Sequence, residues 1–363
     1  MTKALRVGII GASPTRGWAR ESHVPAVQKL AGLELAGVAG RGQEEADAAA
    51  KAFGARRGFG DASVMVRDPE IDLVTVAVRV PSHRDLVLQA LSAGKHVYCE
   101  WPLGRNLAEA EELASAARAA RVHAAIGLQA RRSPALRKAR ELITAGAIGR
   151  VLSARVDSGT VAFGPKTDKA DLYLEDAVNG ATLLTIHGGH ALDAAIAVLG
   201  ALEDVAALAT TQFPEVEVAD DGQRRARTVP DYVVTQSRLS AGGVVSVEVA
   251  GGRSADTTFR FEVVGDTGHL VLRGGAPRGF QSGRLALSLN GRPQQTDEGE
   301  LASAPDTAAN VGGVYAALRD DVLNGTFTVP DFGHAVRLTR LIEDLRVSSE
   351  TGARKPAAHW PET

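Results

Sequence analysis

Residues 5–11, Leu-Arg-Val-Gly-Ile-Ile-Gly, form a short and almost uninterrupted apolar run near the start of the chain. Such a run is typical of a buried strand in a parallel sheet. Glycine and proline follow within residues 11–17, and a helical pattern begins at residue 19. A strand, a glycine-containing turn and a helix in this order offer backbone N–H groups to a dinucleotide pyrophosphate. The turn lacks the later glycines of a full G-x-G-x-x-G motif, so an ordinary turn without a ligand remains an alternative.

The alternation of strands and helices continues to about residue 129. Further strand patterns lie at residues 33–40, 72–78, 96–100 and 123–129, and helical patterns lie at residues 44–53, 61–66, 85–93 and 107–120. This order predicts a doubly wound parallel sheet, that is, a Rossmann dinucleotide-binding domain over residues 1–128.

Strand patterns dominate the second part of the chain. They lie at residues 151–157, 205–213, 232–239, 244–249, 259–264, 269–272 and 285–289, after a helix at residues 135–145 and before helices at residues 308–323 and 333–351. We therefore expect an α+β domain with a large, mostly antiparallel sheet over residues 129–363, and an α/β chain as a whole. The longest irregular stretch, residues 159–178, is longer than an ordinary connection and is a candidate substrate loop.

Composition narrows the class of protein. A length of 363 residues fits two domains, and the net charge of -2 with interspersed signs gives no indication of a nucleic-acid partner. The single Cys99 permits no internal disulfide, which fits a reducing compartment. No leader pattern precedes the first strand, and no apolar stretch reaches the roughly 20 residues of a membrane span. We expect a cytoplasmic protein with no membrane partner, and a homodimer or homotetramer formed through the C-terminal sheet.

Several short motifs resemble the Gfo/Idh/MocA superfamily of nicotinamide-dependent sugar oxidoreductases. They are Ala-Gly-Lys-His-Val at residues 93–97, Cys-Glu-Trp-Pro-Leu at 99–103, Gly-Ala-Ile-Gly at 146–149 and Gly-His-Ala-Leu-Asp at 189–193. The long first turn ending in Trp18, Glu-Ser-His at residues 21–23 and Val-Pro-Ser-His at 80–83 resemble more closely the branch of the fungal galactose-regulon repressor, a non-enzymatic member. The superfamily also includes redox-neutral, NAD-dependent glycosidases, some of which act on sulfoquinovosides.

Two positions depart from the pattern of the family's dehydrogenases. Trp101 stands where those enzymes carry the lysine of a Glu-Lys-Pro motif, and Ile186 stands where they carry an aspartate. The motif histidine is retained as His190, and Asp193 keeps its position. Two of the three polar groups that usually handle the substrate hydroxyl in those dehydrogenases are therefore absent.

The resemblance implies a nicotinamide cofactor, NAD or alternatively NADP. The candidate cofactor-binding residues lie in the first turn and at later strand ends: Gly11, Ala12, Ser13, Thr15, Arg16, Trp18, Arg41, Val80, Pro81, His83, Glu100, Trp101 and Gln129. Arg41 follows the second strand, where an acidic residue would hold the ribose 2′-OH of NAD; an arginine there accommodates a 2′-phosphate or lies on the adenine. For each of these residues an ordinary packing or surface role is the alternative.

Candidate catalytic and substrate-binding residues come from the second domain. His190 and His187 lie three apart on one predicted helical face, and imidazole with a pKa of about 6.5 suits a general base. Lys166 and Tyr173 in the long loop are further catalytic candidates, and the substrate-binding candidates are Trp101, Arg131, Lys166, Tyr173 and His187. Lys166 and Lys169 favour an anionic substrate group, with a solvated loop as the alternative. No third ligand is spaced near the histidines, so we expect no metal.

Three functions remain open at this point. The preferred one is a redox-neutral glycosidase that removes hydride from carbon 3 of an anionic sulfo- or uronic glycoside, because the family lysine is lost and the loop is basic. The second is a conventional NAD(P)-dependent sugar or polyol dehydrogenase, in which His187 or Lys166 replaces that lysine. The third is a cofactor-binding sensor that resembles the repressor.

Overall fold

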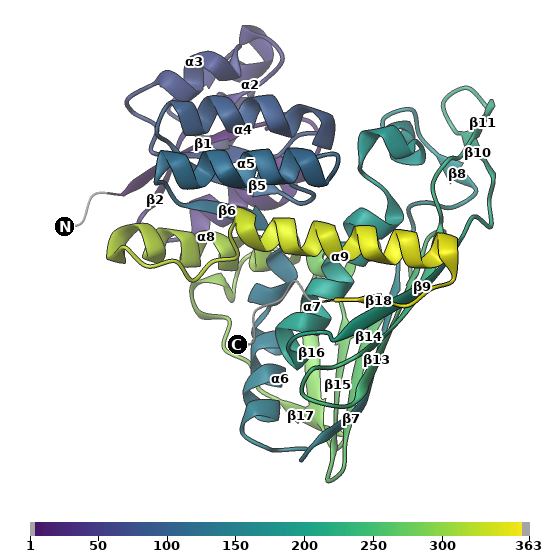
Figure 1. Cartoon of the computed structure of the whole chain (residues 1–363). Coiled ribbons are helices and arrows are strands. Elements are labelled where there is room, and N and C mark those ends of the chain that lie inside the picture. Colours follow the sequence, from purple (N-terminus) through teal and green to yellow (C-terminus); the bar gives the residue numbers. More distant parts are fainter. Residues whose placement is uncertain (1–3, 358–363) are drawn as a thin grey trace. The chain divides into compact units, whose positions relative to one another are not determined.

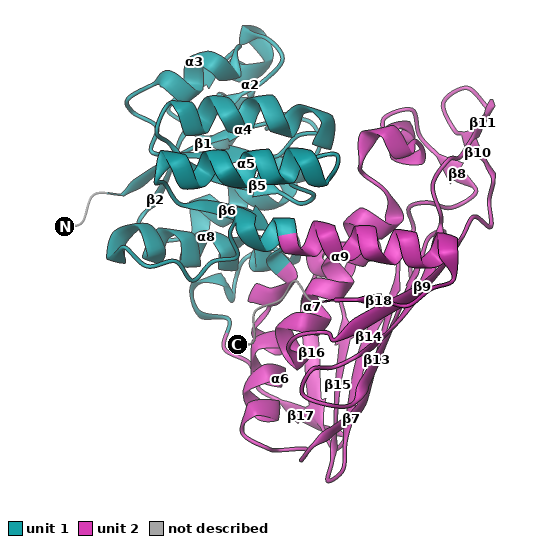
Figure 2. Ribbon diagram, in the orientation of Figure 1, with its two compact units in different colours: residues 1–129, 298–336 teal, residues 130–297, 337–363 magenta. Residues whose placement is uncertain are grey.

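A computed structural model describes residues 4–357, which form two compact units (Figure 1 and Figure 2). The first comprises residues 1–129 and 298–336, and the second comprises residues 130–297 and 337–363. The predicted boundary after residue 128 lies at the first division, but residues 298–336 return to the first unit. The start of the chain at residues 1–3, used above to argue against a leader, lies outside the described residues.

The first unit contains a six-stranded parallel sheet in the order β3-β2-β1-β4-β5-β6. Its strands are β1 (Leu5–Ile10), β2 (Leu33–Ala39), β3 (Arg57–Phe59), β4 (Leu73–Val76), β5 (His96–Glu100) and β6 (Ala124–Gly127). Its helices are α1 (Val24–Lys29), α2 (Gln43–Phe53), α3 (Ala62–Arg67), α4 (His83–Ser92), α5 (Leu107–Ala120) and α8 (Asp306–Asn324). The predicted doubly wound parallel sheet is confirmed, and β3 is a strand that the apolar pattern missed because it has only three residues.

Helix α8 joins the first unit through its apolar face. Val311, Val314, Tyr315 and Leu318 are fully buried in the same core as β1 and α1. Helical periodicity predicts that such a face is buried, but it does not say against which sheet. This is why the sequence placed α8 in the second domain.

The second unit contains a nine-stranded sheet in the order β17-β16-β15-β14-β7-β13-β12-β9-β18. Its strands are β7 (Val151–Gly159), β9 (Asp204–Thr210), β12 (Tyr232–Arg238), β13 (Val244–Ala250), β14 (Phe259–Gly265), β15 (His269–Gly274), β16 (Leu285–Leu289), β17 (Arg292–Gln294) and β18 (Lys355–Pro356). Of the strand pairs described in this nine-stranded sheet, only β7–β13 is parallel, so the prediction of a large, mostly antiparallel sheet is confirmed.

Helices α6 (Pro134–Thr144) and α7 (Gly189–Leu199) pack against this sheet. Helix α9 (Phe332–Thr351) begins in the first unit and continues into the second. A small separate sheet joins β8 (Lys166–Thr167), β10 (Glu215–Val218) and β11 (Arg224–Ala226). The stretch predicted as an irregular loop therefore contains β8 and two short 3₁₀ turns, η4 (Leu172–Glu175) and η5 (Ala177–Asn179).

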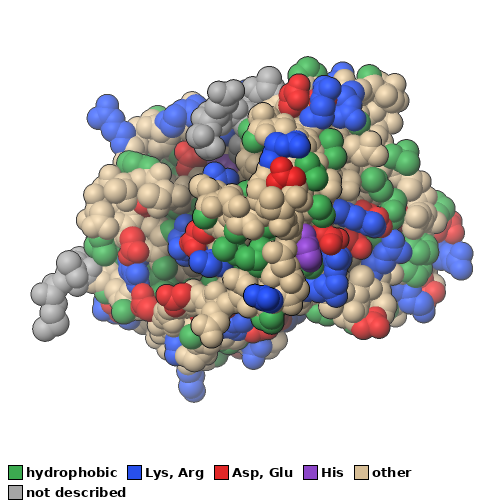
Figure 3. All heavy atoms as spheres, turned by 90° about the horizontal axis from the view of Figure 1, so that it is seen from below, with side chains coloured by type: hydrophobic (Ala, Val, Ile, Leu, Met, Phe, Trp, Pro, Cys, Tyr) green, Lys and Arg blue, Asp and Glu red, His purple; other side chains and the backbone are tan. Residues whose placement is uncertain are grey.

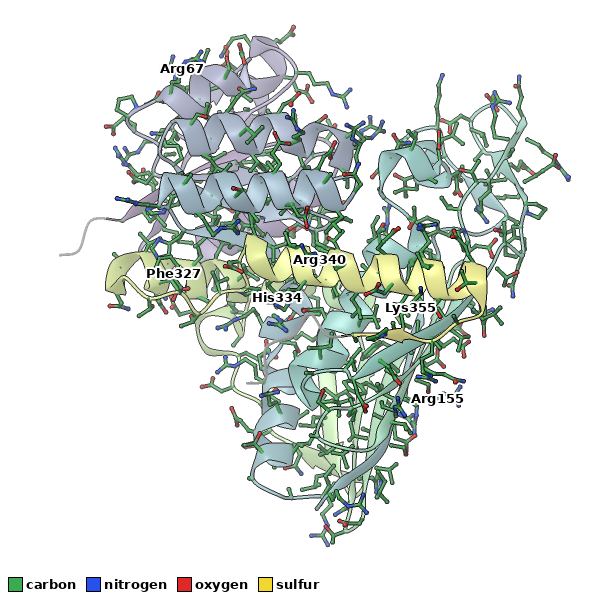
Figure 4. All side chains as sticks on the ribbon, viewed as in Figure 1. Arg67, Arg155, Phe327, His334, Arg340 and Lys355 are labelled. Atoms are coloured by element: carbon green, nitrogen blue, oxygen red, sulfur yellow. The ribbon has the colours of Figure 1, made fainter. Side chains whose placement is uncertain are left out.

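The face of the large sheet opposite to its buried face carries charged and apolar side chains in rows across the strands. One row runs from Leu208 through Val234, Glu248 and Asp157 to Arg260. Arg155 projects from the ribbon of this sheet (Figure 4). Positive and negative side chains are interspersed over the molecular face in Figure 3. No helix of the described residues has the length and apolar character needed to cross a membrane.

Candidate functional site

The turn after β1 has unused backbone donors. Within residues 4–357, no partner takes the amide hydrogens of the turn residues Ala12, Ser13, Thr15, Arg16 and Gly17. Gly11 begins the turn with a φ of 97°, and its amide donates to the carbonyl of Ala39 at 3.2 Å. The turn leads into a π-helical turn, η1 (Ala19–His23), a geometry that is frequent at functional sites. A strand end followed by unpaired N–H groups fits a dinucleotide phosphate.

Gly11 is the residue of this turn that tolerates substitution least. A Cβ there would lie 2.4 Å from the carbonyl oxygen of Ala77, which follows β4, whereas a Cβ on Gly17 would meet nothing within 4 Å. Both glycines have positive φ. We expect Gly11→Ala to lower the free energy of unfolding by about 2–4 kcal/mol, from backbone strain and overpacking together. Gly17→Ala carries only the strain, about 1 kcal/mol. Urea unfolding of both variants checks this, and equal losses would contradict it.

Arg41 lies two residues beyond the end of β2. Arg41 is exposed, and its backbone N–H donates to Oε2 of Glu45 at 3.4 Å. No partner holds its guanidinium among residues 4–357, so the side chain is available to an adenine or a 2′-phosphate. The position keeps both NAD and NADP open, as in the sequence analysis.

The candidates at the ends of β4 and β5 are a buried histidine close to two main-chain carbonyl groups and two residues at the end of β5. His83 is 1% exposed, and its two ring nitrogens lie 2.9 Å from the carbonyl oxygens of Pro102 and Val78. This ring therefore joins the chain after β4 to the chain after β5. Its burial lowers its pKa. Glu100 ends β5 with 13% of its side chain exposed, and Trp101 follows it, 5% exposed.

The remaining strand-end candidates are mostly buried. Val80 is 5% exposed and Pro81 is exposed, at the start of the short 3₁₀ turn η2 (Val80–Ser82). Gln129, in η3 (Gln129–Arg132), is 2% exposed, and its Oε1 has no hydrogen-bond partner among the described residues. A buried amide oxygen without a partner is costly unless a ligand or water donates to it. Gln129 is therefore suited to a bound ligand.

The two histidines lie together in the second unit. His187 belongs to a second π-helical turn, η6 (Leu184–Gly188), and His190 lies in the first turn of α7. They are 6% and 3% exposed, and Nδ1 of His190 has no partner within the described part of the chain. Burial, with Arg278 as a second cause, lowers the pKa of His187 to about 4; burial and then His187 lower that of His190 to about 3. Both rings are neutral at pH 7.

Two residues beside His187 were missed by sequence reasoning. The ring of Phe163 meets that of His187 edge-on at 5.8 Å, and Phe163 has a φ of 58°, unusual for a bulky residue. Strained backbone of this kind is often retained at functional sites. Arg278 pairs with Asp171 at 3.1 Å. Neither residue lies in a motif, and the only signal near Arg278 was its turn rich in glycine and proline.

The buried histidines predict a stability that falls with acid. Unfolded imidazoles protonate near pH 6.5, but His187 and His190 stay neutral in the fold down to about pH 4 and about pH 3. The unfolded chain then binds more protons, so stability is lost as pH falls below 6.5, by about 2 kcal/mol per ring at pH 5. His83 and His96, whose pKa values are also lowered by burial, add to this slope. Urea unfolding from pH 7 to pH 5 should show a shallower slope in His187→Asn; an unchanged slope would contradict this.

The other catalytic and substrate candidates have acidic or main-chain partners nearby. Lys166 lies on β8, 67% exposed, with Nζ 2.9 Å from Oε1 of Glu217. The side chain of Arg131 donates to Oδ2 of the buried Asp193 at 2.9 Å. Tyr173, in η4, is half-buried. The structure thus brings His187 and His190 together and gives the basic residues local partners. It also holds no cluster of three metal-binding side chains among the described residues.

Comparison with known proteins gives a family to each half of the chain. Residues 5–128 match the oxidoreductase family with an NAD-binding Rossmann fold, and residues 134–274 match the C-terminal domain of Gal80p. The dehydrogenase aclE of Aspergillus oryzae is 30% identical over 97% of this chain and 98% of its own length. The galactose/lactose metabolism regulatory protein GAL80 of Saccharomyces cerevisiae is 29% identical over 75% of this chain and 67% of its own length. Levoglucosan dehydrogenase of Pseudarthrobacter phenanthrenivorans is 28% identical over 86% of this chain and 80% of its own length.

Solved structures share the whole architecture. A super-repressor mutant of Gal80p from Saccharomyces cerevisiae superimposes with a TM-score of 0.87 at 25% identity, over 98% of each chain. Levoglucosan dehydrogenase in complex with NADH and L-sorbose superimposes with a TM-score of 0.84 at 23% identity, over 98% of this chain and 99% of the other, which shows a common fold. This chain therefore belongs to the Gfo/Idh/MocA family of NAD-binding oxidoreductases, with a Gal80-like C-terminal domain.

Proposed function

We propose that this protein is a nicotinamide-dependent dehydrogenase that oxidises a secondary hydroxyl group of a sugar or polyol. One relative, which this chain matches over nearly its whole length, is a dehydrogenase, and another is a levoglucosan dehydrogenase. The observation that carries the proposal is the pair of buried, neutral imidazoles, one with an unpartnered nitrogen, in a chain that also has an NAD-binding Rossmann domain.

Oxidation of a secondary alcohol to a ketone removes a hydride from carbon and a proton from oxygen. The nicotinamide, when bound, supplies the hydride acceptor. His190 offers its unpartnered Nδ1 to the hydroxyl as a hydrogen-bond acceptor. Because its pKa is about 3, the ring is unprotonated at neutral pH and can accept the proton, but it is a weak base and passes the proton on to solvent. His187 shares the site as a second neutral acceptor or donor.

This proposal replaces the anionic glycoside preferred from sequence as the first choice. The basic side chains that favoured an anionic substrate have acidic neighbours: Lys166 is paired with Glu217 and Arg131 with Asp193. A redox-neutral glycosidase remains the alternative, because it begins with the same oxidation. It would then eliminate the substituent on carbon 1, add water and return the hydride, with no net reduction of the cofactor.

A sensor function is a second candidate, favoured by two specific positions. Trp101 and Ile186 replace the polar residues of the family's dehydrogenases, and GAL80, a regulatory protein, is among the relatives. A sensor would bind the nucleotide and turn nothing over. Since a dehydrogenase matches more of the chain than GAL80 does, we place the enzyme first.

A panel assay distinguishes the three functions. The purified protein is incubated with NAD⁺ or NADP⁺ and with sugars, polyols and neutral or anionic glycosides, while reduced nicotinamide and released aglycone are measured together. Sugar-dependent formation of reduced nicotinamide is the expected result. Aglycone release without net reduction would identify the glycosidase, and saturable nucleotide binding without turnover would identify the sensor; either outcome overturns the dehydrogenase.

For the oligomer, we propose that a second copy of the chain covers the open face of the large sheet. Basic and acidic side chains are neighbours there, so the face can pair with itself around a two-fold axis. Leu208, 64% exposed, adds apolar surface. In analytical ultracentrifugation we expect a dimer that Leu208→Arg converts to monomer, whereas Val178→Arg, at a similarly exposed position on η5, leaves it intact. A monomeric wild type would contradict the proposal.

A further inference from the structure

His23 lies at the centre of a buried polar chain in the first unit. Its side chain is 0% exposed, and its Nδ1 lies 2.9 Å from the hydroxyl of Tyr315 on α8. That hydroxyl lies 2.6 Å from Oγ1 of Thr75 on β4. On the other side, Nε2 of His23 lies 2.9 Å from Oε1 of Glu100 at the end of β5. The chain thus connects four elements of the Rossmann domain at one point.

The direction of the hydrogen bonds follows from the carboxylate. A carboxylate oxygen accepts, so at the 2.9 Å contact with Glu100 we place the ring hydrogen of His23 on Nε2. Nδ1 then accepts from the hydroxyl of Tyr315, whose oxygen accepts from Thr75. Nε2 of His23 and Oε1 of Glu100 lie 2.9 Å apart, and neither atom has a hydrogen-bond partner among the described residues. The buried hydroxyl of Tyr98 also interacts with Glu100.

The surrounding structure leaves room for the Glu100 carboxylate and limits its movement. A Cβ on Gly127 of β6 would lie 2.9 Å from Oε1 of Glu100, so glycine is required beneath it. The rings of Tyr98 and Tyr315 meet that of His23 edge-on, at 5.1 and 5.7 Å. Glu100 is the only one of the four chain members with side-chain exposure above a few per cent, at 13%.

We propose that His23 is a positioning residue that fixes the Glu100 carboxylate as an acceptor for the nicotinamide half of the bound dinucleotide. Glu100 ends β5 directly before Trp101, and ligands of a doubly wound sheet bind at the carboxyl ends of its strands. A carboxylate held on one oxygen by a buried imidazole presents its other oxygen in a fixed direction to an N–H or O–H donor. The inference rests on the proposed nucleotide-dependent function and assigns a role to the Glu-Ser-His segment that the sequence left unexplained.

Two substitutions distinguish the contact of Nε2 with Glu100 from the contact of Nδ1 with Tyr315. The amide of glutamine reaches the place of Nε2, so His23→Gln keeps a donor toward Glu100. The amide of asparagine reaches only the place of Nδ1, so His23→Asn keeps the contact with Tyr315 and loses the one with Glu100. Tyr315→Phe is the structural control, because it breaks the chain on the far side of His23.

The test is the affinity for NADH and for ADP, measured by calorimetry on the full-length chain and its variants. ADP keeps the adenine and the pyrophosphate but lacks the nicotinamide. We expect His23→Asn to weaken NADH binding about tenfold, as for the loss of one close polar contact to a carboxylate, and to leave ADP binding unchanged. His23→Gln and Tyr315→Phe should stay within about threefold of the wild type for NADH.

The outcomes separate this inference from the proposed function. If the wild type binds NADH but His23→Asn and His23→Gln behave alike, or if ADP binding weakens in parallel, His23 has only a structural role and the inference is overturned. If the wild type itself binds no NADH, the proposed function fails, and the inference fails with it.

Discussion

Replacing His190 by asparagine should lower kcat about a hundredfold on the sugar that the wild type oxidises fastest. Asparagine retains a polar group at this buried position but does not act as a general base, and loss of a general base typically costs 10²–10⁴-fold. We expect the lower end, because a ring with a pKa of about 3 is a weak base. NADH affinity should be unchanged, since the nucleotide-binding residues belong to the other unit. Steady-state kinetics with calorimetry for NADH checks both expectations.

The pH dependence supplies the control for this prediction. With both histidines neutral above about pH 4, the rate should show no loss between pH 8 and pH 6 from protonation of either ring. An inflection near pH 6.5 that disappears in His190→Asn would show an ordinary imidazole there instead. A full-activity variant would remove His190 from the mechanism altogether.

Replacing Arg227 by methionine should be the most destabilising single change in the second unit. The guanidinium is 0% exposed and bonds to carboxylates of Glu175 and Asp231 and to the carbonyl of Gly164. Removing it leaves two buried carboxylates unpaired, which typically costs about 3–5 kcal/mol. Arg225→Met is the matched control, because its pair with Asp221 is solvent-exposed and worth at most about 1 kcal/mol.

The effect of Arg227→Met is measured best in the segment that Arg227 contacts. Glu175 and Gly164 both lie within residues 159–178, so we expect hydrogen exchange in this segment to accelerate strongly in Arg227→Met and to be unchanged in Arg225→Met. Thermal unfolding of the same variants gives the global effect. If hydrogen exchange in Arg227→Met is as slow as in the wild type, the buried ion pairs do not hold this segment in place.

The architecture was predictable because it follows from periodicity. The apolar run of β1, the alternating helices and the later antiparallel strands were all legible in the sequence, and each was confirmed. The assignment of α8 was not, because an apolar helical face does not identify the sheet that it covers. The two π-helical turns at His23 and His187 also leave no recognised signature in a single sequence.

Only part of the candidate site could be predicted from the sequence. The resemblance to the family pointed to His187, His190 and Glu100, but no spacing rule could show that Lys166 pairs with Glu217 on a small sheet, since those residues are 51 positions apart. The sequence interpretation therefore linked the charge of this loop to a substrate and could not weigh it against the ion pair of Lys166 with Glu217. The buried Arg227 cluster was missed for the same reason, because its acidic partners are distant in the sequence or carry no motif.

The binding of NADH tests the central claim most directly. Calorimetric titration of the full-length chain should show saturable binding of one NADH per chain, competed by ADP, and weaker binding in Gly11→Ala than in Gly17→Ala. A wild-type chain that binds no NADH or NADPH at millimolar concentration would contradict the account, and so would binding that Gly11→Ala leaves unchanged.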